Sequence, residues 1–518
     1  MKYPIGIQSF DRIIEDGYVY VDKTDLIYQL AQEGSIYFLS RPRRFGKSLL
    51  VSTLEHYFLG HKELFKGLKI DQLEKDWNVY PVFHVDFNGS NFTQAGVLEE
   101  RLEDYVSGWE TRYGLTSEAD RLDVGGRFIK VLRAAHEQTG RRAVVLIDEY
   151  DKPILDVLDV DTGLEDRHRN VLKAFYSVFK GADAHLQFVL LTGVTKFSQV
   201  SVFSGFNQPK DISMDRRYEA LCGITQEEID RYFPAPIAEM ADEYGFTPEE
   251  MKQRLKLQYD GYHFSERLTD VYNPFSLLNA LDSQSVDDYW FRSGTPTYLI
   301  RLLTHFNENL NELTGKYYRP EEFIDYKADV EQPLPMIFQS GYLTIKGYDK
   351  RFRTYTLSFP NREVEEGFIQ FLLPAYSSTS RSDSAFEMVH FVREVESGNI
   401  SAFMRRLQSF FADTPYELVR DLELHYQNVL FIVFKLLGFY TQAEYHTSNG
   451  RIDLVIKTDH YIYVLEFKLE GTAEEALQQI NDKQYAQPFA SDSRQLYKIG
   501  VNFSNETRNI EKWLVEEN

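Results

Sequence analysis

The stretch IYFLSRPRRFGKS, residues 36 to 48, decides how the first half of this chain folds. Ile36–Ser40 is a short apolar run that predicts a buried strand, and Lys47 to Phe58 has the pattern of a helix. The turn between them ends in Gly-Lys-Ser, like the phosphate-binding loop G-x-x-x-x-G-K-[ST], although Arg41 stands where that loop has its first glycine. A strand before the turn and a helix after it are the context that this loop requires.

The residue types in this turn suit the phosphate chain of a nucleotide. Gly46 lets backbone N–H groups approach the phosphates, where the helix N-terminus adds a positive dipole end. Lys47 can reach the β- and γ-phosphates, and the Ser48 hydroxyl can ligate Mg²⁺. Arg43 and Arg44 add positive charge beside the same site. We therefore predict that the turn binds Mg·ATP; the alternative is a basic turn with an incidental Gly-Lys-Ser.

A second apolar run supplies the carboxylates that such a site needs. Val144 to Ile147 is apolar and is followed by Asp148 and Glu149. Unpaired charge at the end of a buried strand is costly, so these carboxylates need a function. In an ATPase, Asp148 would bind the Mg²⁺ water shell, and Glu149 would orient and deprotonate the attacking water. The alternative is a strand that meets a solvated turn.

Two further positions are candidates for contacts to the γ-phosphate. Thr192 ends the apolar run that begins at Leu186, where a polar side chain can sense the phosphate or simply cap the strand. Arg216 and Arg217 are candidates for an arginine finger; the other interpretation is an exposed basic pair.

Two strands near the C-terminus carry another set of charged residues. The run from Tyr461 to Lys468 predicts a strand in which Glu466 and Lys468 share a face, because side chains alternate. If it forms a hairpin with the strand after Gly450, Asp453 can lie beside them. Asp453 and Glu466 would then hold Mg²⁺ or Mn²⁺, and Lys468 would position the attacking water or stabilise the transition state of phosphodiester cleavage. The alternative is a set of solvated charges and cross-strand ion pairs.

The order of the predicted elements indicates several domains. Strands at 36–40, 82–87, 143–148 and 186–192 alternate with helices, which is typical of an α/β fold with a parallel sheet. A polar run at 377–384 predicts a linker. The expected segments are a P-loop ATPase core (1–222), a helical lid region (223–330), a winged-helix-like unit with a packing role (331–376), a linker with helices (377–420) and a restriction-endonuclease-like α/β domain (421–518).

Bulk composition excludes several classes of protein. The single cysteine, Cys222, excludes an internal disulfide and a Cys-rich zinc site. The formal net charge of −22 counts against sequence-independent coating of DNA. No apolar run reaches membrane-spanning length, and the N-terminus lacks the pattern of a signal peptide. We therefore expect a cytoplasmic protein that does not enter a membrane.

Several short motifs of the first half resemble one known family. They are Pro4-Ile5-Gly6, Tyr20-Val21-Asp22-Lys23-Thr24, the loop from Arg41 to Ser48, Asp148-Glu149-Tyr150-Asp151-Lys152-Pro153 and Thr192-Gly193-Val194-Thr195-Lys196-Phe197-Ser198. In combination they resemble the AAA-ATPase-like family of the Bacteroidetes type, over roughly residues 1 to 290. That family also has arginine at the first-glycine position, so the resemblance implies a functional ATP site.

The C-terminal segment resembles the PD-(D/E)xK nuclease superfamily. The match rests on Glu423-Leu424-His425-Tyr426, Gly450-Arg451-Ile452-Asp453, Glu466-Phe467-Lys468 and Gln479-Ile480 with Tyr485. The resemblance implies that Glu423, on the first helix, is an additional catalytic carboxylate; Glu444 is the other candidate. Relatives often have Q-x-x-x-Y in the last helix, whereas Tyr485 here follows Gln479 by a wider spacing.

These features together predict an ATP-hydrolysing protein that controls a Mg-dependent nuclease. The expected partners are ATP and a nucleic acid, DNA rather than RNA, and the sequence leaves a homo-oligomer open. The alternative is a STAND-like signalling ATPase whose nuclease-like domain binds without cleaving.

Overall fold

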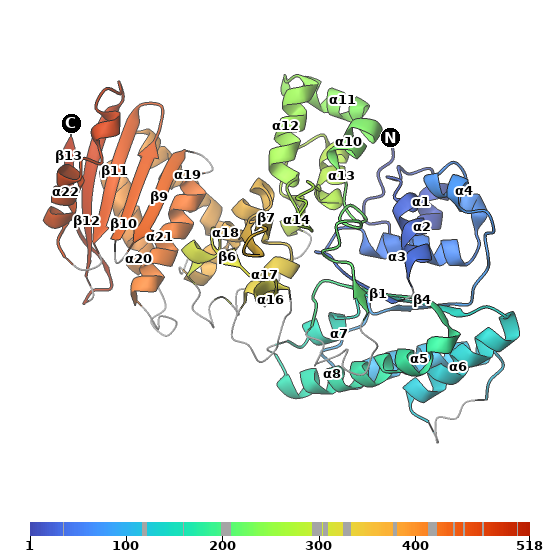
Figure 1. Cartoon of the computed structure of the whole chain (residues 1–518). Coiled ribbons are helices and arrows are strands. Elements are labelled where there is room, and N and C mark those ends of the chain that lie inside the picture. The colour runs from blue at the N-terminus through green and yellow to red at the C-terminus, as the bar shows by residue number, and fades with distance from the viewer. Residues whose placement is uncertain are drawn as a thin grey trace. The chain divides into compact units, whose positions relative to one another are not determined.

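The computed structural model describes most of the chain as two compact units (Figure 1). It describes residues 1–34, 36–116, 122–158, 160–197, 209–292, 303, 309–324, 333–376, 381–412, 422–438, 441–448, 451–468, 471–504 and 506–517, except the side chains at 292, 311, 375, 381–387, 412, 422–423, 443–448 and 451–453. The first unit comprises Met1–Tyr298 and Tyr317–Glu363, and the second comprises Leu299–Lys316 and Val364–Asn518. Within the described residues, no helix has the length and apolar character needed to cross a membrane.

A five-stranded parallel sheet lies at the centre of the first unit. Its strand order is β2-β3-β4-β1-β5, and every neighbouring pair is parallel. The strands are β1 (Ile36–Ser40), β2 (Val82–Asp86), β3 (Ala143–Asp148), β4 (Leu186–Gly193) and β5 (Lys210–Asp211). Every residue of β3 is buried, as its unbroken apolar run predicts for a strand covered on both faces. The predicted α/β fold with a parallel sheet is confirmed.

Helices cover both faces of this sheet. Figure 1 shows α1 to α3 on one side of β1 and β4, and α5, α6 and α8 on the other. These helices are α1 (Phe10–Glu15), α2 (Thr24–Glu33), α3 (Lys47–Phe58), α5 (Val97–Arg112), α6 (Val124–Thr139) and α8 (Thr162–Tyr176). Short helices complete this part: η1 (Lys62–Phe65), α4 (Lys69–Leu73), α7 (Lys152–Leu155), α9 (Val178–Gly181) and η2 (Asp183–His185).

The chain from residue 226 onward is mainly helical, as predicted. The helices are α10 (Gln226–Tyr232), α11 (Pro234–Tyr244), α12 (Pro248–Tyr259), α13 (Pro274–Ser283) and α14 (Tyr289–Arg292). Capping boxes start α10 and α12, where Thr225 pairs with Glu228 and Thr247 pairs with Glu250.

A small three-stranded sheet follows in the same unit. The order is β6-β8-β7, formed by β6 (Tyr317–Tyr318), β7 (Thr344–Asp349) and β8 (Thr354–Ser358), with α16 (Pro320–Phe323) and α17 (Leu334–Gln339) before it. Three residues before β7, Gly341 lies close to the phosphate-binding turn. Gly341 has φ +90°, and a Cβ on it would lie 2.6 Å from Pro42 Cβ, so this position permits close approach to the phosphate-binding turn.

The second unit packs helices on both faces of a mixed sheet. The strand order is β13-β12-β11-β10-β9; β11 and β12 are parallel, and the other pairs are antiparallel. Its strands are β9 (Gln442–Ser448), β10 (Arg451–Lys457), β11 (Tyr461–Lys468), β12 (Gln495–Ser504) and β13 (Asn509–Glu517). Its helices are α18 (Arg362–Tyr376), α19 (Arg381–Glu396), α20 (Ile400–Ala412), α21 (Leu422–Gly438) and α22 (Ala473–Asp482).

The linker predicted at 377–384 is wrong in its second half. Residues 381–384 form the first turn of α19, so the polar composition did not prevent helix formation there. Residues 377–380 lie outside the described residues. The break between the two units falls earlier, at Glu363 and Val364 near the start of α18.

Candidate functional site

The predicted phosphate-binding loop has the backbone of an anion-binding turn. Gly46 has φ +89° and caps α3, which begins at Lys47, and Arg44 also has a positive φ of 68°. Residues in the left-handed region turn successive N–H groups toward one point, where α3 adds its positive dipole end. The local geometry therefore suits phosphate.

Lys47 is held inside this loop. Its side chain is buried, and Nζ donates to the carbonyl oxygens of Arg41 at 3.0 Å and Pro42 at 3.1 Å. Burial lowers the pKa of Lys47, and the carboxylates of Glu149, Asp148 and Asp151 oppose that shift. An ammonium bonded only to neutral carbonyls can exchange them for phosphate oxygens, which are charged and bind it more strongly.

The strand order brings the predicted acidic residues to the same sheet edge. Because β4 lies between β1 and β3, Thr192 at the end of β4 lies between the loop after β1 and Asp148 at the end of β3. The buried Thr192 hydroxyl donates to Asp148 Oδ1 at 2.5 Å. This bond fixes the orientation of the carboxylate predicted to serve Mg²⁺.

Glu149 has an unusual backbone and environment. Its φ is +50°, which is strained for a residue with a Cβ, and its N–H donates to Asp148 Oδ1 at 3.1 Å. Burial raises the pKa of Glu149, while the charge of Lys47 lowers it. A carboxylate with a raised pKa is a better proton acceptor, as a group that deprotonates water needs to be.

Asp151 belongs to this site, although the sequence prediction did not include it. Its Oδ2 accepts the N–H groups of Val194 at 2.9 Å and Thr195 at 2.6 Å, so it ties the turn after β3 to the turn after β4. The Tyr150 hydroxyl adds a bond to the Thr195 carbonyl at 2.8 Å. The sequence signal that could have indicated Asp151 is the motif DEYDKP, in which a further aspartate follows the acidic pair Asp148 and Glu149.

Arg41, at the first-glycine position, has a packing role. Its guanidinium is buried, donates to the carbonyls of Ser213 at 2.7 Å and Tyr218 at 3.2 Å, and lies 4.0 Å from the centre of the Phe264 ring. Burial lowers the pKa of Arg41 to about 10. Arginine here thus anchors the loop to the segments at 211–218 and 259–264.

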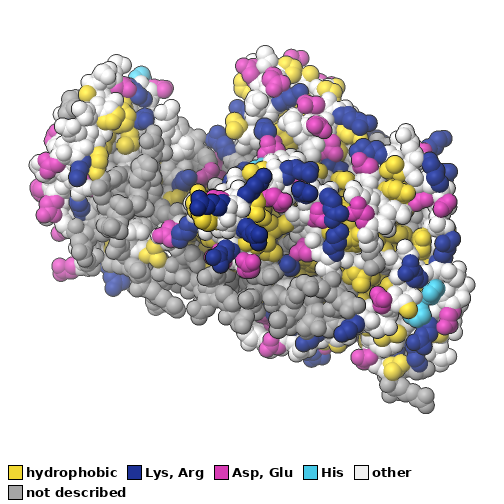
Figure 2. Space-filling model, in the orientation of Figure 1, with side chains coloured by type: hydrophobic (Ala, Val, Ile, Leu, Met, Phe, Trp, Pro, Cys, Tyr) yellow, Lys and Arg dark blue, Asp and Glu magenta, His cyan; other side chains and the backbone are white. Residues whose placement is uncertain are grey.

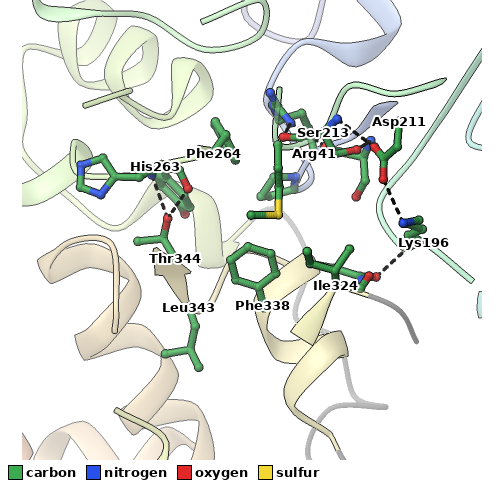
Figure 3. A pocket seen from close by; sticks show the side chains of 15 residues that line it. Arg41, Lys196, Asp211, Ser213, His263, Phe264, Ile324, Phe338, Leu343 and Thr344 are labelled. Atoms are coloured by element: carbon green, nitrogen blue, oxygen red, sulfur yellow. Dashed lines mark hydrogen bonds and ion pairs between the residues drawn. The ribbon is translucent and has the colours of Figure 1, made fainter. Parts of the chain in front are cut away.

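A pocket lies beside the loop (Figure 3). Arg41 and Pro42 line it from the loop, Phe338 lines it from α17, Thr344 from β7, and Leu343 from the residues between them. Its Lys196 is paired with Asp211 at 3.0 Å. The side chains predicted to bind ATP do not line this pocket, so it is a separate space beside the site.

The remaining arginines differ in environment. Arg43 and Arg44 are exposed at the loop, and the Arg44 guanidinium lies 4.8 Å from the centre of the Phe275 ring. Arg217 is paired with Asp215 at 2.5 Å and Glu33 at 2.8 Å, and Arg216 is exposed. The basic-pair interpretation of these last two residues fits those contacts.

Glu466, Lys468 and a glutamine form the centre of the second candidate site. Glu466 is fully buried, its Oε1 accepts from Gln479 Nε2 at 2.6 Å, and Lys468 Nζ lies 3.9 Å from the same oxygen. Lys468 Nζ also donates to Gln479 Oε1. Gln479, which the predicted site did not include, therefore holds the acid and the lysine together from α22.

Close packing of α22 makes this bridge geometrically feasible. Gly500 is the register partner of Glu466, and a Cβ on it would lie 2.3 Å from the Ala473 carbonyl oxygen. Only glycine lets the helix come this near to the sheet. Tyr485 packs against the cluster under α22 that contains Ile480.

The predicted hairpin is present, and its register brings two acidic positions together. In the antiparallel pair of β10 and β11, Asp453 is directly opposite Glu466. Directly opposite positions share a face of the sheet. The side chains of Asp453, Glu423 and Glu444 lie outside the described residues.

A divalent cation fits the described part of this site. Glu466 is a fully buried carboxylate beside Lys468, and carboxylate oxygens are the ligands that Mg²⁺ and Mn²⁺ prefer. Among the described side chains, no group of three or more His, Cys, Asp and Glu residues is placed to hold a metal, and Asp453 is not one of these side chains.

Charges are mixed on the surface of the first unit. On the face seen in Figure 2, lysine and arginine side chains are interspersed with aspartate and glutamate.

Comparison with known proteins identifies both candidate sites as parts of described families. Residues 4–203 match the family described as "Predicted AAA-ATPase", and residues 421–513 match the PD-(D/E)XK nuclease superfamily. A protein of Azotobacter chroococcum mcd 1, described as "Uncharacterized protein in vnfD 5'region", is 36% identical over 540 residues, which covers 99% of each chain. Similarity to this protein thus extends over both units.

Proposed function

We propose that this chain, which belongs to the predicted AAA-ATPase family and ends in a PD-(D/E)XK nuclease superfamily domain, hydrolyses ATP to control a metal-dependent nuclease. The substrate class is a nucleic-acid phosphodiester, DNA rather than RNA. The proposal also includes a cytoplasmic location and leaves a homo-oligomer open.

The proposed ATPase site consists of residues at the edge of the parallel sheet, after β1 and at the ends of β3 and β4. The N–H groups around Gly46 and the Lys47 ammonium would hold the phosphates, and Ser48 and Asp148 would hold Mg²⁺. Glu149 would take the proton of the attacking water. Thr192 keeps the Asp148 carboxylate in place through its 2.5 Å hydrogen bond. Arg43 and Arg44, exposed at the loop, would attract the nucleotide.

The buried Glu466 carboxylate is the single observation that carries the nuclease half. Glu466 is fully buried, accepts from Gln479 and lies 3.9 Å from the Lys468 ammonium, so an acid of metal-ligand type and a cation are held at one point of the sheet, and removing either partner of such a buried pair is costly. Asp453, its register partner, would share a Mg²⁺ or Mn²⁺ ion with it, and Glu423 would be a further carboxylate. The ion would lower the pKa of bound water and neutralise developing charge. Lys468, oriented by Gln479, would stabilise the phosphate in the transition state.

The test is an assay of the purified full chain against a panel of nucleic acids. Duplex, single-stranded and branched DNA, and RNA, are incubated with Mg²⁺ or Mn²⁺, with and without ATP. We expect metal-dependent cleavage of at least one DNA form, and no cleavage in EDTA. ATP hydrolysis without cleavage of any substrate would overturn the nuclease half and favour a signalling ATPase whose C-terminal domain only binds.

A further inference from the structure

We propose that Trp290 and Glu363 form a relay through which occupancy of the phosphate-binding loop acts on the nuclease unit. This inference rests on the function proposed above, because the relay would connect the proposed ATPase site with the proposed nuclease site. The relay consists of three polar contacts, each within a single unit, and of helix α18, which runs from the first unit into the second.

The first contact joins Trp290 directly to the loop. The indole Nε1–H of Trp290 donates to the carbonyl oxygen of Arg43 at 3.2 Å. The ring is nearly buried and packs edge-on against Tyr342 at 5.1 Å and against Phe291 at 5.2 Å. A ring fixed on both sides cannot follow the Arg43 carbonyl by rotating freely, so a shift of the loop must move α14 or break the bond.

ATP binding would change the hydrogen bonds that hold this part of the loop. Lys47 now bonds to the carbonyls of Arg41 and Pro42, the two residues before Arg43. When Lys47 exchanges these carbonyls for phosphate oxygens, the segment loses two bonds that hold it toward the lysine. The Arg43 carbonyl follows directly in the chain, so Trp290 is bonded to the segment that nucleotide occupancy releases.

The second contact passes from Trp290 to the start of α18. The backbone N–H of Trp290 donates to Glu363 Oε1 at 2.7 Å, and the Glu363 side chain is fully buried. The backbone N–H of Tyr289 and the side chain of Ser276 also stabilise this carboxylate. Displacement of Trp290 would therefore remove one of the few polar contacts that fix Glu363, and such a loss is costly for a buried acid.

The helix then carries the chain from one unit into the other. Glu363 is in the first turn of α18 and is the last residue of the first unit; Val364 begins the second. Two residues along, Glu365 Oε1 lies 3.0 Å from Lys435 Nζ on α21, within the second unit. Helix α21 packs on β9, which pairs with β10, the strand of Asp453.

The test is hydrogen exchange of the full chain with and without Mg·ATP. In the wild type, ATP should slow exchange in the loop at 41–50 and change it by at least about threefold at the start of α18 and in α21. Trp290→Phe removes the Nε1–H donor and keeps an aromatic ring beside Tyr342 and Phe291. This variant should retain the effect at the loop and lose it in α18 and α21. Trp77→Phe is the matched control, since the Trp77 indole N–H has no partner among the described atoms.

A second variant removes a later contact of the relay, the ion pair between Glu365 and Lys435. Glu365→Gln removes a partly exposed ion pair, so it should fold normally, keep the ATP effect at the start of α18 and lose it in α21. An unchanged α21 response in both variants would overturn the relay while leaving the proposed function standing. Absence of ATP protection at the loop of the wild type would instead refute the proposed ATP site, and the relay with it.

Discussion

The two candidate sites are built from the same chemical groups by different means. In the first, Lys47 follows β1, Asp148 ends β3, and Thr192 joins them from the strand in between. In the second, Glu466 and Lys468 stand two residues apart on one strand, and Gln479 bridges them from a helix. Topology assembles the first site, whereas strand alternation and one close helix assemble the second. Substitutions at the edge of the parallel sheet should therefore impair the first site. The activity of the second site should depend on the distance between α22 and the sheet.

The largest effect is expected from removing the acidic residues of the second site. Asp453→Ala and Glu466→Ala should each reduce cleavage to the level of the metal-free control, because the cation loses one of the two carboxylates proposed to share it. ATP hydrolysis should be nearly unchanged, since the loop lies in the other unit. Cleavage and phosphate release measured on the same samples check this, and a parallel loss of both activities would mean that the sites are not separate.

Lys47→Ala should abolish ATP binding measured by calorimetry. The ammonium is buried inside the loop. The buried guanidinium of Arg41 is held by the carbonyls of Ser213 and Tyr218, and the exposed Arg43 and Arg44 cannot replace the contact of Lys47 to the β- and γ-phosphates. An affinity within about threefold of the wild type would contradict the assignment. Glu149→Gln is the matched variant: it should bind ATP and hydrolyse it much more slowly, because the proton acceptor is lost and the phosphate contacts remain.

Thr192→Val tests whether the strand between the two motifs matters. The substitution conserves shape and removes the hydrogen bond to Asp148. A bond to a charged group is worth ~1.5–3 kcal/mol, so the rate of hydrolysis should fall about 10- to 100-fold. ATP affinity should change much less. Steady-state kinetics separate the two quantities, and an unchanged hydrolysis rate would show that Asp148 does not need this anchor.

Gly500→Ala tests the dependence of the second site on close packing. The added Cβ would meet the Ala473 carbonyl oxygen at 2.3 Å, so α22 must move and Gln479 must leave Glu466. We expect a loss of about 3 kcal/mol of stability, from the overpacking, together with loss of cleavage. Gly108→Ala, where a Cβ meets nothing within 4 Å, should leave stability and cleavage unchanged or slightly improve stability.

The smallest effect concerns pH and Glu363. Burial raises the pKa of Glu363 to about 7 from an ordinary value of 4.5. Between these values the native state holds a proton that the unfolded state has released. Stability is therefore lost as pH rises from about 4.5 to about 7. Glu363→Gln should match the wild type near pH 4.5 and exceed its stability by ~2 kcal/mol at pH 8, as measured by denaturant unfolding. A constant difference across this range would contradict the shift.

Much of both sites could be predicted from the sequence because the decisive signals are local. The strand bounds at 36–40, 143–148 and 461–468 are as predicted, since unbroken apolar runs end at charged residues. The shared face of Glu466 and Lys468 follows from strand alternation, and the register of Asp453 follows from a tight hairpin. None of these inferences needs knowledge of distant parts of the chain.

The missed features depend on contacts between segments far apart in sequence. The bond from Thr192 to Asp148 requires that β4 lies between β1 and β3, which no local pattern encodes. Gln479 reaches Glu466 only because a glycine on a third element admits α22. The first turn of α19 was predicted as a linker because its serines favour turns, and the helix forms there nevertheless.

The most direct measurement of the central claim is the ratio of nuclease rates with and without ATP. Cleavage of DNA by the full chain in Mn²⁺ or Mg²⁺ is timed at saturating ATP and without nucleotide, for the wild type and Lys47→Ala. For the wild type, we expect the ratio of the cleavage rate with ATP to the rate without ATP to differ clearly from 1. For Lys47→Ala this ratio should equal 1, and the rates without nucleotide should be the same for both proteins. A wild-type ratio of one, with both ATP hydrolysis and cleavage present, would contradict control of the nuclease by ATP.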